Sequence, residues 1–86
     1  MSGIDWENVA REAVHPLRMR ILEHAASDPD TRLAPSQLAA TWGEPLGNVS
    51  YHVRGLRAQG LLVAAGTTTV RGAVRHYYRA GPKLLS

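Results

Sequence analysis

Five positions between residues 45 and 59 carry residues whose types and spacing suit contact with nucleic-acid bases. Val49, Val53 and Leu56 recur at intervals of four and three residues, which predicts the buried stripe of an amphipathic helix. Amide, hydroxyl and guanidinium groups opposite that stripe can bond to base edges or phosphates, a tyrosine ring can contact a thymine methyl group, and a glycine permits close approach. The outward positions are Gly47, Asn48, Ser50, Tyr51 and Arg54.

Two further groups of residues are candidates for contact with a phosphate backbone. Arg57 lies almost one turn beyond Arg54, and Ser36 and Gln37 open the preceding helix, where backbone amides favour an anion. A loop expected over residues 66–72 and the strand after it supply more hydroxyl groups and cations. These are Thr67, Thr68, Thr69, Arg71, Arg75 and Arg79.

The distribution of charge along the chain favours a polyanionic partner. All seven carboxylates lie at or before Glu44, and against four arginines they leave residues 1–44 with a net charge of −3. Residues 45–86 carry five arginines and Lys83 and no carboxylate, so their net charge is +6. A cationic half that includes the candidate helix is expected to bind nucleic acid, and double-stranded DNA is the first candidate.

The elements that must position these residues are four helices followed by a β-hairpin. Proline suits the first turn of a helix and glycine its end, so these residues set the expected boundaries. The helices are expected over residues 4–14, 16–26, 35–42 and 45–59, with Glu44 as the cap of the last. Strands are expected over 61–65 and 73–80, and Leu33 can begin a short extended segment.

This order predicts a fold that is mainly α-helical with a small β-hairpin, a winged helix-turn-helix. One domain is expected over residues 1–80, with a loose tail over residues 81–86. Alternation along the second strand gives it an inward and an outward face. The inward residues are expected to be Val74, His76, Tyr78 and Ala80, and the outward residues Arg75, Tyr77 and Arg79.

Three segments in this order resemble the ArsR-like bacterial regulators. HPLRMRIL (15–22) is similar to their second helix, SQLAATWGEPLGNVSYHVRGLRAQGLL (36–62) to their helix-turn-helix, and VRHYYRA (74–80) to the return strand of their wing. The resemblance covers about residues 10–80. It implies a transcriptional regulator, usually a repressor that blocks access of the polymerase, with the fourth helix in the major groove and the wing on the backbone or minor groove.

The composition argues against metal binding, cofactor binding and catalysis. The 86 residues include no cysteine, so no disulfide framework or thiolate metal site is expected, and a cytoplasmic protein is the simplest interpretation. The four histidines show no pair one helical turn apart beside a carboxylate, so neither a metal nor another cofactor is expected. No nucleophile, base and orienting partner emerge from the sequence, so we expect no enzyme.

Several alternatives stay open from the sequence. A winged-helix module that binds only protein is the first, a regulator with a small-molecule or metal effector is the second, and RNA binding is the third. A homodimer through the first helix, with Trp6 and Val9 as candidate contacts, would suit a two-fold DNA site, and a monomer stays open as the alternative.

Overall fold

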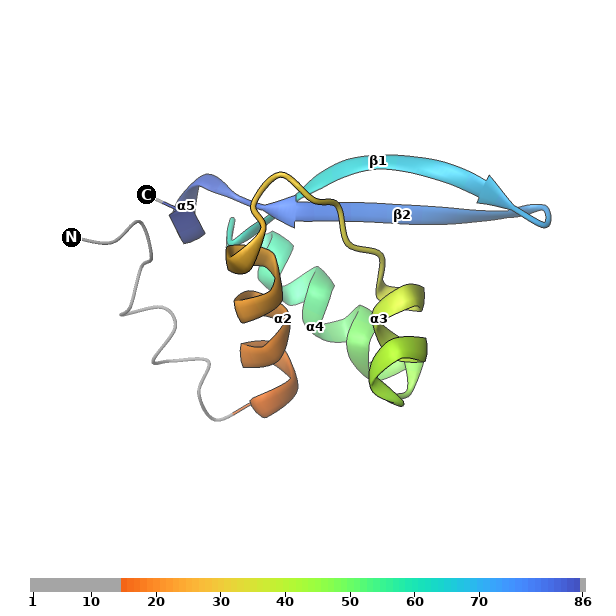
Figure 1. Cartoon of the computed structure of the whole chain (residues 1–86), viewed down its shortest axis with the longest axis horizontal. Coiled ribbons are helices and arrows are strands. Elements are labelled where there is room, and N and C mark those ends of the chain that lie inside the picture. The colour runs from red at the N-terminus through yellow and green to blue at the C-terminus, as the bar shows by residue number, and fades with distance from the viewer. Residues whose placement is uncertain (1–14, 86) are drawn as a thin grey trace.

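Three helices lie beneath a long β-hairpin in the computed structural model, which describes residues 15–85 (Figure 1). The far end of the hairpin projects beyond α3, away from the helical body. This architecture confirms the predicted winged helix-turn-helix, while the helix expected over residues 4–14 lies outside the described residues. The elements are α2 (Pro16–Ser27), α3 (Pro35–Trp42), α4 (Leu46–Ala58), β1 (Leu62–Val70), β2 (Ala73–Ala80) and α5 (Pro82–Leu85).

Proline and glycine set the helix boundaries largely as expected. Pro16 and Pro35 open α2 and α3, and Gly43 ends α3 with a φ of 65°, the left-handed conformation that glycine adopts without strain. The predicted start of α4 was one residue early. Pro45 has an extended ψ of 132° and precedes the helix, and its carbonyl oxygen accepts hydrogen bonds from the amides of Asn48 and Val49. The cap position therefore falls on Pro45 instead of Glu44.

The buried stripes of the three helices meet in one hydrophobic core. Val49, Val53 and Leu56 of α4 are completely buried, as the spacing predicts. Leu33 and Tyr78 form a backbone bridge. The Tyr78 amide donates a 2.8 Å hydrogen bond to the Leu33 carbonyl oxygen, and the Leu33 amide donates a 2.7 Å hydrogen bond to the Tyr78 carbonyl oxygen, so the chain is extended at Leu33 as expected. The other members of the core are Ile21, Leu22, Ala25, Leu38, Ala39, Leu61, Leu62, Ala80 and Leu84.

The hairpin is longer than predicted, and the expected loop over residues 66–72 is wrong. The strands continue to Val70 and from Ala73, so only Arg71 and Gly72 form the turn. Their φ angles of 52° and 81° match a two-residue turn of type I′, whose twist fits a hairpin. Three consecutive threonines extend the strand because β-branched side chains favour extended backbone.

A bulge interrupts the hairpin about halfway along. The register shifts by one residue between Ala64 and Thr67, and Gly66 within the bulge has a φ of 102°. Arg32 supports this point, because its guanidinium lies 4.3 Å from the centre of the Tyr77 ring and donates a 3.3 Å hydrogen bond to the carbonyl oxygen of Ala65. The bulge therefore separates a packed inner half of the hairpin from an exposed outer half.

The predicted inward face of β2 is correct only at its inner end. Tyr78 and Ala80 are buried, but Val74 is 59% exposed and His76 is exposed as well. The outer half of the hairpin extends past the helices, so neither of its faces has a core to pack against (Figure 1). Alternation in the sequence distinguishes two faces and does not tell where along the strand the core ends.

The structure also corrects the prediction of a loose tail over residues 81–86. Instead of a loose tail, Pro82–Leu85 forms the short helix α5, and Leu84 is 1% exposed within the core. The Gly81 amide donates a 2.9 Å hydrogen bond to the carbonyl oxygen of Leu61. Burial of Leu84 and this hydrogen bond attach the segment to the root of the hairpin.

A polar contact between α2 and α4 accounts for the glycine within α4. Nε of Arg18 donates a 3.0 Å hydrogen bond to Nδ1 of His52. The guanidinium of Arg18 then crosses α4 at Gly55, where an added Cβ would lie 2.6 Å from Nη2 of Arg18. The missing side chain at Gly55 thus makes room for an arginine that links the two helices.

Candidate nucleic-acid interface

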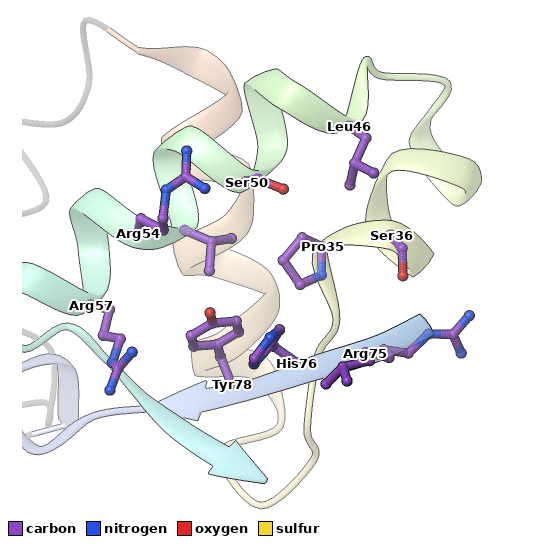
Figure 2. A pocket seen from close by; sticks show the side chains of 11 residues that line it. Pro35, Ser36, Leu46, Ser50, Arg54, Arg57, Arg75, His76 and Tyr78 are labelled. Carbon is purple, nitrogen blue, oxygen red and sulfur yellow. The ribbon is translucent and has the colours of Figure 1, made fainter. Parts of the chain in front are cut away.

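A recess of about 370 Å³ lies between α4, the start of α3 and β2 (Figure 2). Its walls come from segments far apart in the sequence, which the core holds together through Val53 of α4 and Tyr78 of β2. The lining residues are Pro35, Ser36, Leu46, Ser50, Val53, Arg54, Arg57, Val74, Arg75, His76 and Tyr78.

Three arginines bring positive charge to the recess from two sides. Arg54 and Arg57 are exposed on α4, and the half-buried Arg75 lines the recess from β2, with its side chain directed away from the other two (Figure 2). No carboxylate lines the recess, so this charge is not neutralised within the described part of its wall. A concave surface lined by charge of one sign concentrates the field, and an anion is the complementary ligand.

Five of the predicted contact residues share this recess. Ser36 and Ser50 are half-buried in it, and their side chains appear beside the arginines in Figure 2. Serine hydroxyl groups can donate to phosphate oxygens or to base edges. The structure therefore brings together Ser36, Ser50, Arg54, Arg57 and Arg75.

The remaining predicted residues lie outside the recess. Gly47, Asn48 and Tyr51 are exposed elsewhere on α4, and the Tyr51 ring, 64% exposed, meets the His52 ring edge-on at 5.3 Å between centroids. Thr69 and Arg71 are exposed at the far end of the hairpin.

Gln37 is the predicted residue that faces away from the others. It is exposed, and it lines a second hollow of about 440 Å³ with His24 and Trp42, on another side of α3. Trp42 is partly buried there, with the guanidinium of Arg20 4.5 Å from its ring centre. Contact of Gln37 with a ligand in the first recess is therefore not supported by its position.

Two apolar residues of the recess were missed by the sequence analysis. Leu46 is 51% exposed at the start of α4, and Val74 is 59% exposed on β2. Leu46 lies three and seven residues before Val49 and Val53, a spacing that continues the buried stripe, so periodicity alone does not predict its exposure. The position of Val74 depends on where the hairpin leaves the core, and no local signal carries that information.

Two of the described histidines, His52 and His24, contact neighbouring side chains. His52 accepts the hydrogen bond from Arg18, and the His24 ring meets the Trp42 ring edge-on at 5.8 Å. Within residues 15–85 no three His, Asp or Glu side chains converge in a way that would hold a metal ion. Nor does any helix in that range have the length and apolar character needed to cross a membrane.

Comparison with known proteins agrees with this geometry. A family profile described as a helix-turn-helix domain matches residues 14–63, which cover α2, α3, α4 and the start of β1. No curated protein matches the chain significantly. Helix-turn-helix domains are typically DNA-binding modules without enzymatic activity. Because the matched segment makes up more than half of the 86 residues, the chain belongs to the helix-turn-helix domain family, which indicates a DNA-binding regulator.

Proposed function

We propose that the protein is a sequence-specific transcriptional regulator of the ArsR-like type that binds double-stranded DNA. In this proposal α4 enters the major groove and the outer half of the hairpin follows the backbone or the adjacent minor groove. The observation that carries it is the recess, which is lined by Arg54 and Arg57 of the helix-turn-helix together with Arg75 of the hairpin. One anionic ligand, the sugar-phosphate backbone, complements both elements at once.

The exposed side of α4 supports reading of bases in addition to phosphates. The first turns of a helix in this position meet base edges, and here they offer Asn48, Ser50 and Tyr51. Gly47 has nothing within 4 Å of the place where a Cβ would stand, so its backbone is open to close approach. Arg54 lies one turn further along the helix, within reach of guanine edges or phosphates.

The direct test is selection of binding sites from random duplexes at near-physiological salt. We expect enrichment of a defined sequence, and a palindrome would show that two copies bind together. With four to six phosphate contacts, the logarithm of the affinity should fall with the logarithm of salt concentration at about −0.9 per contact. Failure to enrich any sequence would contradict the proposal and favour the protein-interaction module.

A matched pair of variants distinguishes the recess from overall charge. Arg75→Ala and Arg20→Ala each remove one positive charge, but only Arg75 lines the recess, whereas Arg20 lies against Trp42. Arg75→Ala should weaken duplex binding severalfold, and Arg20→Ala should leave it nearly unchanged. Equal losses would indicate attraction by net charge alone, without a defined interface.

Repression is the regulatory outcome proposed here, through occlusion of the polymerase at the bound site. Its test is transcription in vitro from a promoter that carries the selected sequence, which the protein should reduce.

Dimerisation through residues 4–14, with Trp6 and Val9, remains a prediction about a segment outside the described residues. Sedimentation of the wild-type protein and of Trp6→Ala tests it, because loss of the interface should lower the sedimenting mass.

A further inference from the structure

Leu46 is a half-exposed apolar residue at the start of α4. It is the first residue of the helix, and it is 51% exposed while Val49, Val53 and Leu56 on the same helix are completely buried. It does not belong to the hydrophobic core cluster of the described residues. The exposed half of this side chain is therefore available to an external partner.

The surroundings of Leu46 determine which partner fits. Its side chain points into the recess, toward Pro35 and Ser36, as Figure 2 shows. Val74, another exposed apolar residue, lines the same recess from β2. Arginines of α4 and β2 border this apolar surface, so the partner must combine an apolar feature with negative charge nearby.

We propose that Leu46 is a specificity-determining residue that contacts the C5-methyl group of a thymine in the major groove. The inference rests on the proposed DNA binding and adds a base preference to it. Thymine presents the apolar methyl group of the major groove, whereas cytosine presents an amino group at the neighbouring position and no methyl group. Leu46 favours thymine because the methyl group covers its exposed surface, and a polar amino group would lose water there without gaining a hydrogen bond.

The experiment removes the methyl group from the DNA and the side chain from the protein. Each thymine of the selected duplex is replaced in turn by deoxyuridine, which lacks only that methyl group. Wild-type protein should bind about fourfold more weakly at one position, the fold-change expected for burial of one methyl-sized group. Leu46→Ala should bind the unmodified duplex more weakly and should no longer distinguish thymine from deoxyuridine at that position.

Two variants serve as controls. Leu85 is 37% exposed on α5 and does not line the recess, so Leu85→Ala should keep the full sensitivity to deoxyuridine. Tyr51 is a second candidate for thymine contact, and Tyr51→Ala should keep the sensitivity at the position that Leu46 reads. Circular dichroism melting of all three variants separates a loss of contact from a loss of folding. The deoxyuridine series with wild-type protein changes only the DNA, so protein folding cannot affect it.

The possible results separate this inference from the function on which it rests. If no duplex is bound specifically, the proposed function fails and the inference fails with it. If duplex binding is specific but Leu46→Ala retains the sensitivity to every thymine methyl group, only the inference is overturned. A fall in sedimenting mass of free Leu46→Ala, with its thymine discrimination intact, would overturn it in favour of a protein contact.

Discussion

The fourth helix and the outer half of the hairpin belong to the same candidate interface, but they are held in very different ways. α4 buries Val49, Val53 and Leu56 completely and is linked to α2 through Arg18 and His52. In the hairpin, residues 69–74 are all exposed, and cross-strand pairing holds these residues together. Packing therefore fixes the position of α4, while the hairpin end depends on its strands and its turn.

This difference suits two kinds of contact with one duplex. Base edges are discriminated by hydrogen bonds of defined length and direction, so the helix that reads them must be held firmly. Phosphate groups repeat along the backbone and attract cations over a longer range, so an adaptable hairpin is sufficient. In the proposed complex, the packed helix would supply specificity and the exposed hairpin end would supply affinity.

The largest expected effect is on stability when the packing of α4 is reduced. Leu56→Ala should lower the free energy of unfolding by about 2–5 kcal/mol, because it leaves a cavity at a completely buried site. Val74→Ala, on the exposed half of the hairpin, should change it by no more than about 0.5 kcal/mol. Urea denaturation at 25 °C measures both, and similar losses would show that the two regions do not differ as described.

The second prediction concerns the root of the hairpin. Gly81→Ala should destabilise the protein by about 1–3 kcal/mol, because its Cβ would lie 2.5 Å from the carbonyl oxygen of Gly60. Gly47→Ala, where nothing lies within 4 Å of the new Cβ, should be neutral or stabilising by up to about 1 kcal/mol. Thermal melting compares the two, and a tolerant Gly81 would mean that α5 is not firmly attached.

The third prediction distinguishes base reading from phosphate attraction. Arg54→Ala should cost about 1–3 kcal/mol in duplex binding and relax the preference at one base position. Arg71→Ala, at the hairpin turn, should weaken binding to all duplexes alike and reduce the magnitude of the salt slope by about 1. Fluorescence anisotropy on matched and mismatched duplexes makes the comparison. A uniform loss in Arg54→Ala would assign α4 to the backbone instead of the bases.

The smallest effect is expected at the turn itself. Arg71 has a φ of 52°, a conformation that is unfavourable for arginine and accessible to asparagine, which is common at the first position of this turn type. Arg71→Asn should therefore raise the free energy of unfolding by up to about 1 kcal/mol while weakening DNA binding. If stability rises and binding is unchanged, Arg71 has no role in the interface.

Prediction from the sequence succeeded where short-range patterns carry the information. The helix spacing identified the buried residues of α4, and proline and glycine identified the boundaries of α3. It failed at the hairpin, where His76 and Val74 alternate correctly but no core lies beneath them. It failed also at residues 81–86, because the burial of Leu84 depends on a site built by distant residues.

By itself, the sequence determined the order of elements, the stripe that turns α4 inward and the concentration of positive charge in residues 45–86. These properties follow from backbone conformation and periodicity, which act over a few residues. Only the tertiary structure decided that Arg75 and Arg54 line one recess, that Gln37 lines another hollow, and that Leu46 is exposed in the recess with the arginines. Such placements depend on how the core joins segments about 20–40 residues apart along the chain, and no local pattern encodes that packing.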